Sequence, residues 1–331
     1  MGQGAQYERK LPFREAPGLW PGSFNIDSWV GGMRKKTLKV FLVLVLCLQS
    51  INAFGTDWAD IQAFLIKKIS SRSPFAMSGS EFAKSLSAMD KSGREQAIVS
   101  QIIKGNQPDF LRRLKPVQLV QKFGERKTVT ATIFVMPDYL AIGSDRDFLL
   151  MPMGWYAATA IAVRLGFILP TKKMVDAIFE QSDVHLSPAP MPPGPQMRSL
   201  AYFSEHNRKI KEQRLSLGCP LGALISGHKK DVVLTNRLGE TLGRVAIYGW
   251  HRLSGIPIQP LTIVHGANYA DYSHGIRLVS DVVLIDGEPR SIYEILEDPR
   301  LATIVSDEGP IQKILQFMGI HHSYPTQAVS F

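Results

Sequence analysis

Four histidines lie between residues 228 and 274, each beside a segment that has the composition of a β-strand. They are His228, His251, His265 and His274. Imidazole is the side chain whose pKa lies closest to neutral pH, so it can both accept and donate a proton there. Catalytic side chains favour strand ends and the loops that follow them, where a rigid scaffold positions them. Although a single histidine in such a place is often structural, four together indicate acid–base chemistry.

The segment 269–277 combines a carboxylate, two phenols, a hydroxyl, an imidazole and a guanidinium. The residues are Tyr269, Asp271, Tyr272, Ser273, His274 and Arg277. We expect His274 to act as general base or acid, and the carboxylate of Asp271 to orient it. Arg277 would hold an anionic group or an oxyanion. Ser273 completes this part of the predicted catalytic set.

Two further groups extend the predicted site beyond this segment. His228 and Asp231 precede the apolar strand Val232–Leu234, and His265 follows the apolar run Leu261–Val264. We assign these two histidines and this aspartate to the catalytic set as well. The predicted substrate contacts are Tyr269, Tyr272, His251 and Trp250.

The strand pattern after His274 opposes a shared cavity for His274 and Arg277. In a regular strand these two side chains point to opposite faces. They can share one cavity only if Gly275 marks a bulge or bend that turns His274, as strand glycines often do. The catalytic assignment of Arg277 therefore predicts a bulge at Gly275.

His265, Asp271 and His274 could also supply two imidazoles and a carboxylate to a divalent metal. Their spacing follows none of the usual zinc patterns. We therefore expect neither a metal nor another cofactor, and a divalent metal is the less favoured alternative.

A different mechanism would use Cys219 as nucleophile and a downstream histidine as base. A free cysteine followed by the strand-like run His274–Leu278 is similar to the small papain-like cell-wall endopeptidases of bacteria. That resemblance implies a Cys–His peptidase. In that family, however, the cysteine opens a helix, whereas Pro220 follows Cys219 and disfavours the helix start that would lower the pKa of the thiol. We therefore expect Cys219 to be a buried, unreactive thiol.

A third alternative is a surface module without catalytic activity. It would bind glycans through aromatic side chains in the strand-rich region, namely Tyr248, Trp250, Tyr269 and Tyr272. This function requires coplanar, exposed rings, whereas an enzyme requires the polar side chains to converge in one pocket.

The elements that must position these residues follow from hydrophobic periodicity. Apolar residues at helical spacing predict helices within 54–114, one of them opened by a capping box at Ser78–Glu81, and later helices at 172–180 and 197–215. β-Branched residues predict a strand over 128–135 paired with 139–143, and further strands between 232 and 285. We predict an α+β fold in which N-terminal helices (54–115) precede an α+β domain (116–331) with a mainly antiparallel sheet in the C-terminal half.

The N-terminal 53 residues have the pattern of an export signal. A cluster of basic residues at 34–39 precedes the apolar run Val40–Leu48, and the small residue Ala53 follows. The run is much shorter than the roughly 20 residues that span a bilayer. We predict a signal peptide over 33–53 with cleavage near Ala53, a secreted or periplasmic protein, and no stable membrane insertion. Residues 1–32 are interpreted in one of two ways: the true start lies at Met33 and these residues are not translated, or they are an extension without structure.

The charge balance argues against a nucleic-acid partner. The chain has 38 Lys and Arg residues against 29 Asp and Glu residues, a formal net charge of +9, and part of this excess lies in the predicted signal. No basic stripe of the kind that binds nucleic acid is present. Together, these features predict a secreted hydrolase that acts on an extracellular or cell-wall polymer or on a small ester.

Overall fold

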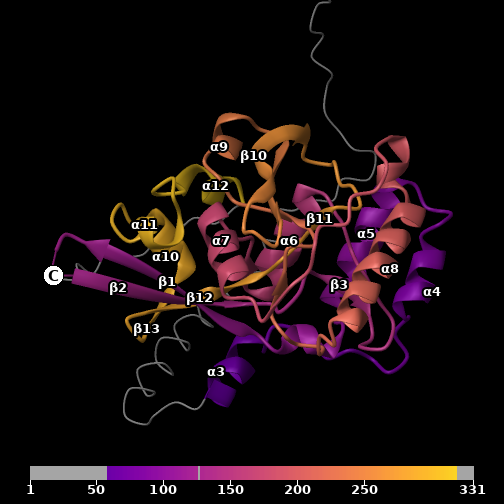
Figure 1. The fold of residues 1–331 in the computed structure, drawn as a ribbon, viewed down its shortest axis with the longest axis horizontal. Helices are drawn as coiled ribbons and strands as arrows, with labels where there is room; N and C mark the ends of the chain where they lie inside the picture. The colour runs from indigo at the N-terminus through magenta and orange to yellow at the C-terminus, as the bar shows by residue number, and fades with distance from the viewer. Residues whose placement is uncertain (1–57, 126, 319–331) are drawn as a thin grey trace, which may run out of the picture. The chain divides into compact units, whose positions relative to one another are not determined.

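The computed structural model describes residues 58–125 and 127–318 (Figure 1). The predicted signal peptide, its cleavage site and residues 1–32 lie outside the described residues. The described residues form an α+β fold, as predicted: helices alternate with largely antiparallel sheets, and most strands lie in the C-terminal half. No helix among the described residues has the length and apolar character needed to cross a membrane.

The first elements are helices whose starts are set by local side chains. They are α3 (Trp58–Leu65), α4 (Gly79–Ser85), α5 (Lys91–Ile103) and the short 3-10 helix η2 (Asp109–Arg112). The predicted capping box at Ser78 is confirmed, since its hydroxyl accepts a hydrogen bond from the Glu81 N–H while the Glu81 carboxylate accepts one from the Ser78 N–H. Such reciprocal bonds satisfy two of the N–H groups that a helix start leaves free.

The larger sheet has five strands, and all its pairs are antiparallel. The path is β1 (Lys115–Phe123), β2 (Lys127–Val135), β12 (Val279–Ile285) and β13 (Glu288–Ser291), with β5 (Phe167–Ile168) also paired to β12. The predicted pairing of 128–135 with 139–143 is wrong, because β2 pairs with β1 and β12. β3 (Ala141–Gly143) instead forms a hairpin with β4 (Phe148–Leu150).

The turn between β3 and β4 is capped by its own side chains. The Ser144 hydroxyl accepts a hydrogen bond from the Asp147 N–H, and the Asp147 carboxylate accepts one from the Ser80 N–H at the start of α4. The carboxylates of this turn thus support backbone structure.

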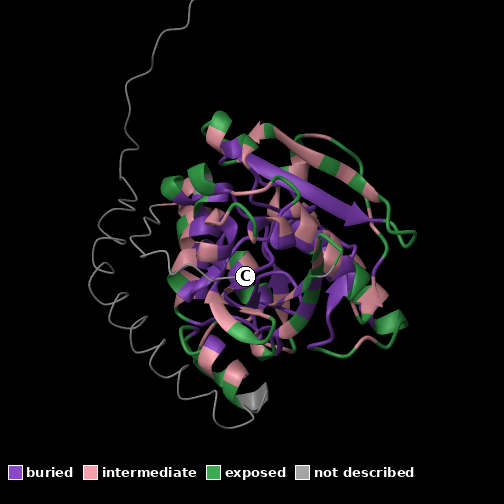
Figure 2. Ribbon diagram, turned by 90° about the vertical axis from the view of Figure 1, so that its left-hand side faces the viewer, coloured by how far each residue is buried: buried purple, intermediate pink, exposed green. Residues whose placement is uncertain are grey.

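The smaller sheet carries five of the eleven residues predicted to be functional, namely Asp231, Trp250, His251, His265 and His274. Its order is β10 (Pro257–Gly266), β9 (Arg244–His251), β8 (Lys230–Val232) and β11 (His274–Gly275). β11 runs parallel to β8, whereas the other pairs are antiparallel. Figure 2 shows that β9 is buried along nearly its whole length while the edge strand β10 is partly exposed. This edge position suits Pro257 and Pro260, which cannot donate a ladder hydrogen bond.

Helices and short strands connect and cover the two sheets. The remaining helical elements are α6 (Trp155–Leu165), α7 (Lys172–Glu180), η3 (Pro195–Arg198), α8 (Leu200–Ser216), α9 (Arg237–Glu240), α10 (Ile292–Glu297), α11 (Ala302–Val305) and α12 (Gln312–Phe317), and β6 (Val184–His185) pairs with β7 (Ile225–Ser226). α7 packs against β9 and β1, and so lies between the two sheets. On the polar helix α8, His206 and Arg214 are buried rather than solvated.

Candidate functional site

The parallel pairing of β8 with β11 brings the two predicted groups of catalytic residues together. Lys230 lies opposite His274 and Asp231 opposite Gly275, and the Lys230 N–H donates a hydrogen bond of 2.7 Å to the Ser273 carbonyl. Segments 228–231 and 271–277, far apart in the sequence, therefore form one polar region. Nearly all of the buried side-chain polar atoms that lack a hydrogen-bond partner in the described residues belong to positions 206–277. Each such atom calls for an explanation, which can be a catalytic role, a bound water or ion, or stored strain.

His274 forms the centre of this region on one side of β11. It is 1% exposed, and neither ring nitrogen has a hydrogen-bond partner among the described residues. Its Nε2 lies 4.0 Å from Oδ2 of Asp271. The other carboxylate oxygen of Asp271 accepts hydrogen bonds from the Ser273 N–H (2.8 Å) and the Ser273 hydroxyl (2.6 Å). Asp271 is thereby fixed beside the imidazole.

Burial determines the protonation state of this pair. It lowers the pKa of His274 to about 4, although the negative charge of Asp271 acts in the opposite direction. Burial also disfavours the charged form of Asp271, but the neighbouring imidazole and the hydrogen bonds from Ser273 lower the pKa of this carboxyl below its usual value. A neutral imidazole therefore faces a carboxylate at neutral pH, which is the arrangement that a general base requires.

Half-buried side chains connect this pair to the surface. The Tyr269 ring stacks on His265 at 4.0 Å between centroids, and it meets the His274 ring edge-on at 5.6 Å. Its hydroxyl donates to Oδ2 of Asp271 at 3.1 Å. Lys230 reaches the same region, with its ammonium 5.1 Å from the centre of the Trp250 ring. His265, Tyr269 and Lys230 thus form the outer part of the site.

A second polar network surrounds Arg277, whose side chain is fully buried. Its guanidinium donates to the carbonyls of Met136 (2.8 Å) and Ile225 (2.6 Å) and lies 4.4 Å from the centre of the Tyr139 ring. The Tyr139 hydroxyl in turn donates to Asp231 at 2.9 Å. Burial raises the pKa of Asp231 to about 6, against the effect of the Arg277 charge. This network fixes backbone segments to one another.

No register shift accompanies Gly275, which is the last residue of β11, and the contacts of Arg277 differ from those of His274. The register continues without a shift from His274 opposite Lys230 to Gly275 opposite Asp231. Gly275 is required for close packing instead, because a Cβ there would lie 2.6 Å from the Tyr139 ring. Arg277 lies beyond the end of β11, so strand alternation does not govern its direction. Its guanidinium donates to the carbonyls of Met136 and Ile225 and is not beside His274, which gives Arg277 a structural role.

His228 belongs to the same structural network through Asp138. Oδ1 of Asp138 lies 3.0 Å from Nε2 of His228, and Oδ2 accepts a hydrogen bond of 2.5 Å from Arg214. Although burial opposes ionisation, His228 and Arg214 lower the pKa of Asp138 to about 2. The sequence analysis missed Asp138, Tyr139 and Arg214, because nothing in their local sequence distinguishes them.

Lys229 is a further residue of this region that the sequence analysis missed. Its side chain is 1% exposed, and the ammonium donates a hydrogen bond of 2.5 Å to the Tyr272 carbonyl. Burial lowers the pKa of Lys229 to about 7, although Asp271 and Asp138 favour the charged form. Its position between His228 and Asp231, both of which were predicted to be catalytic, could have indicated it.

Three of the four predicted substrate contacts are buried in the core. Tyr272, Trp250 and His251 are 2%, 5% and 4% exposed. The Tyr272 hydroxyl bonds to the backbone of Met191, and the His251 ring stacks on Phe179. Only Tyr269 reaches the surface, so these rings form no exposed platform for a glycan.

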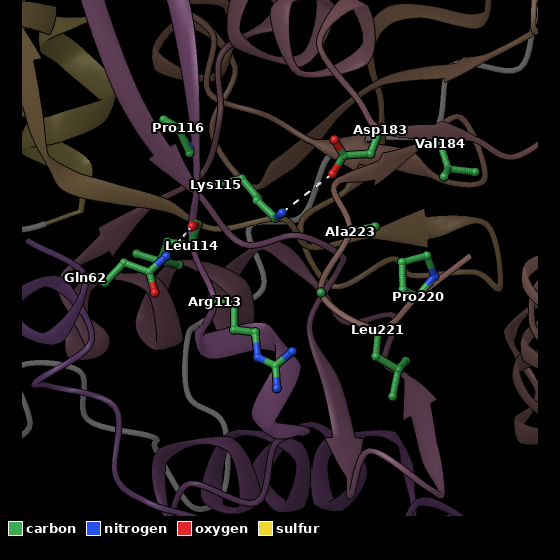
Figure 3. A pocket seen from close by; sticks show the side chains of 11 residues that line it. Gln62, Arg113, Leu114, Lys115, Pro116, Asp183, Val184, Pro220, Leu221 and Ala223 are labelled. Atoms are coloured by element: carbon green, nitrogen blue, oxygen red, sulfur yellow. Dashed lines mark hydrogen bonds and ion pairs between the residues drawn. The ribbon is translucent and has the colours of Figure 1, made fainter. Parts of the chain in front are cut away.

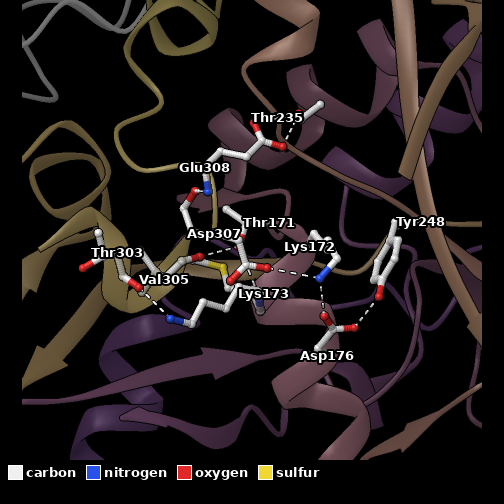
Figure 4. Close-up of polar contacts among 12 residues, drawn as sticks. Thr171, Lys172, Lys173, Asp176, Thr235, Tyr248, Thr303, Val305, Asp307 and Glu308 are labelled. Carbon is white, nitrogen blue, oxygen red and sulfur yellow. Dashed lines mark hydrogen bonds and ion pairs between the residues drawn. The ribbon is translucent and has the colours of Figure 1, made fainter. Parts of the chain in front are cut away.

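His251 and Tyr248 belong to a network that binds α7 to its neighbours. Figure 4 shows Asp176 of α7 between Lys172 and Tyr248, with hydrogen bonds of 2.9 and 2.7 Å. His251 lies 3.2 Å from the same carboxylate. Lys172 also reaches Asp307, beyond α11, at 3.1 Å. The role of His251 is therefore to join β9 to α7.

Cys219 directly precedes Pro220, which lines a separate cavity of about 520 Å³. Figure 3 shows this cavity, whose lining includes Arg113, the ion pair of Lys115 with Asp183, and Pro220. The thiol is half-buried rather than buried, and burial raises its pKa. No hydrogen bond or ring contact of Cys219 within the described residues involves a histidine. Cys219 follows the end of α8 and opens no helix.

No group of three or more His, Cys, Asp or Glu side chains in the described residues is arranged to hold a metal ion. The chain matches no model of a known protein family, no curated protein and no solved structure. Its function is therefore inferred from the geometry of this site.

Proposed function

We propose that the chain is a hydrolase in which His274 activates a water molecule and Asp271 orients the imidazole. The observation that supports this proposal is the state of His274: a buried neutral imidazole, without a hydrogen-bond partner in the described residues and beside a fixed carboxylate. A core histidine normally has its polar atoms satisfied. Leaving both nitrogens available disfavours folding, and such a feature is expected where a substrate or water must bind.

The reaction is a general-base hydrolysis. His274 takes a proton from water, the water oxygen attacks the carbonyl carbon of the substrate, and the resulting imidazolium gives the proton to the leaving oxygen or nitrogen. Asp271 stabilises the imidazolium while it exists. Lys230 is the residue paired with His274 across the two strands, and its ammonium would attract the negative charge that develops on the carbonyl oxygen.

Ser273 and Tyr269 position Asp271 in this mechanism. The Ser273 hydroxyl is fully buried and donates to the carboxylate, so it is not free to attack a substrate. The Tyr269 hydroxyl donates to the same carboxylate from the outer side. His265, stacked on Tyr269, would contact the substrate as it enters.

The substrate class is an extracellular or cell-wall polymer or an ester, which follows from the export pattern of residues 33–53. Expression of the full chain in a bacterial host tests this part of the proposal. The intact mass of the exported protein should correspond to a chain that begins at Phe54. A soluble protein that keeps all 331 residues would contradict it.

The catalytic proposal is tested with His274→Ala, Asp271→Asn and the control His185→Ala. Residue His185 lies on β6 and contacts Phe179 rather than the site. The probes are p-nitrophenyl butyrate and dye-labelled bacterial cell walls. We expect His274→Ala to reduce turnover by about 100-fold or more, and the control to retain wild-type activity with the same circular dichroism spectrum.

The pH profile separates the two roles. Because the Asp271 charge raises the pKa of His274, Asp271→Asn should move the acid limb of kcat/KM to lower pH as well as reduce kcat. Equal activity of wild type and His274→Ala, or no turnover of either probe by the wild type, would contradict the proposal.

A further inference from the structure

A cleft of about 360 Å³ ends beside the outer part of the candidate site. Its walls come from α5, from the segment before α6, and from η3 with the start of α8. Ala270, which lies between Tyr269 and Asp271, also lines it. The volume is in the range of small-molecule sites, which begins at about 300 Å³.

Arg198 and Tyr269 join the cleft to His274. Arg198 lines the cleft, and its guanidinium lies 6.0 Å from the centre of the Tyr269 ring. The same Tyr269 ring meets the His274 ring edge-on, with 5.6 Å between the ring centres. In addition, the Tyr272 N–H donates to the Met197 carbonyl at 3.0 Å, which holds η3 against the catalytic segment.

The polar lining of the cleft is mainly cationic. Lys91 and Arg198 have exposed side chains, and neither donates a hydrogen bond to a described residue. Arg94 is fixed to the wall, because its Nε donates to the carbonyls of Leu86 and Met89. Three cations therefore converge on a space with one carboxylate, that of Glu95.

The carboxylate of Glu95 is occupied by the backbone of the cleft wall. Both of its oxygens accept the Gly154 N–H, at 3.0 and 3.2 Å, in front of the first turn of α6. Burial raises the pKa of Glu95 to about 7, and the Gly154 hydrogen bond and Lys91 oppose this shift. Glu95 thus cannot neutralise the three cations, and the cleft retains a net positive charge.

The floor of the cleft is apolar. It includes the side chains of Leu86, Ile98, Met151 and Phe203, all of which are buried. A ligand that matches both parts has an apolar chain for the floor and an anionic group for the cationic rim.

We propose that this cleft binds a carboxylate-bearing acyl segment of the substrate and leads the adjoining bond to His274. The orientation of the substrate towards His274 rests on the proposed hydrolase function, whereas the binding of a carboxylate in the cleft does not depend on it. Arg198 and Lys91 would hold the carboxylate through charge-assisted hydrogen bonds, which their unoccupied donors allow.

Calorimetric titration of the whole chain with two matched probes tests the cleft. N-octanoyl-glutamate α-amide carries the apolar chain and a single carboxylate, on its side chain, and N-octanoyl-glutamine α-amide has a neutral side chain of the same shape and no carboxylate. The wild type should bind the glutamate probe about tenfold more tightly. The variants Lys91→Gln and Arg198→Gln should each weaken glutamate binding by about three- to tenfold and leave glutamine binding unchanged.

The matched control is Lys122→Gln, because Lys122 is an exposed lysine on β1 and does not line the cleft. It should bind both probes as the wild type does. Equal affinity of the wild type for the two probes, or a loss in Lys122→Gln as large as that in Arg198→Gln, would overturn the cleft assignment.

The His274→Ala variant distinguishes this inference from the hydrolase proposal. It should keep the preference for the glutamate probe while it loses turnover. Charge-selective binding in a protein without hydrolytic activity would refute the hydrolase and leave the cleft. Hydrolysis without any charge preference would refute the cleft alone.

Discussion

The substitution Gly275→Ala tests the packing that separates the two sides of β11. The new Cβ would lie 2.6 and 2.7 Å from two carbons of the Tyr139 ring and 2.7 Å from Cβ of Lys229. Carbon atoms in contact are normally about 3.5–4.0 Å apart. The neighbours would have to move by about 1 Å, which a close-packed interior resists.

Neither neighbour can move cheaply. The Tyr139 ring is held by its hydrogen bond to Asp231 and by the guanidinium of Arg277 over its face. The Cβ of Lys229 lies next to the backbone that leads into β8. Overpacking of a core costs about 1–3 kcal/mol. Because three contacts are short and both partners are anchored, we expect Gly275→Ala to lower the free energy of unfolding by about 3 kcal/mol.

Gly266→Ala is the matched control, since Gly266 is also a strand glycine. The nearest atom to a Cβ at that position is the Gly243 carbonyl oxygen, at an ordinary 3.8 Å. The control should change stability by less than about 1 kcal/mol, in either direction. Urea unfolding at pH 7, followed by circular dichroism, measures both variants.

A double-mutant cycle of Gly275→Ala with Tyr139→Leu tests whether the loss of stability arises from the clash with the Tyr139 ring. In a Tyr139→Leu background two of the three short contacts disappear, so Gly275→Ala should cost at least about 1 kcal/mol less than it does in the wild type. A loss of less than about 1 kcal/mol for Gly275→Ala itself, or the same loss in both backgrounds, would refute the packing described for β8 and β11.

Three further predictions concern buried charge, pH and the free thiol. Arg214→Met leaves the Asp138 carboxylate buried without its ion-pair partner, so it should lower the free energy of unfolding in urea by about 3–5 kcal/mol. Arg208→Met, on the solvent side of the same helix, should lower it by less than about 1 kcal/mol. Equal losses of stability in the two variants would contradict this prediction. Because the folded-state pKa of His274 (about 4) lies below its ordinary value of 6.5, its neutral form contributes stability that is complete above pH 6.5 and is lost as the pH falls towards 4. Unfolding measured across this range should therefore show a smaller loss for His274→Gln than for the wild type, and equal slopes would refute the shift. Cys219→Ala should leave turnover within about twofold and stability within about 1 kcal/mol, and an inactive, stable variant would instead favour the Cys–His peptidase.

Local signals in the sequence were reliable where a side chain acts on nearby backbone. The capping box at Ser78 is present, and Thr171 caps α7 by accepting a hydrogen bond from the Met174 N–H. Asp286 and Gly287, a dipeptide typical of hairpin turns, join β12 to β13, and both residues have positive φ angles. These interactions span two to four residues, so they require no tertiary structure.

Strand pairing was less predictable, because it depends on contacts between distant segments. The segment 139–143 follows β2 directly, yet β2 pairs with β1 on one side and with β12 on the other. Partner choice is decided by which faces are buried against the rest of the core. The sequence of one strand does not contain that information.

For the candidate site, the sequence by itself predicted that residues 228–231 and 265–277 include the reactive side chains and that Cys219 is unreactive because Pro220 follows it. Only the tertiary structure decided the role of each residue. Asp138 and Arg214 are 76 residues apart, and Tyr139 and Asp231 are 92 apart, so their contacts leave no trace in local sequence. The parallel pairing of β8 with β11 brings His274 opposite Lys230, while the segment that follows β11 places the Arg277 guanidinium among backbone carbonyls. The physical reason is burial: residue type sets what a side chain can donate or accept, whereas the surrounding fold determines its partners, its pKa and its access to a substrate.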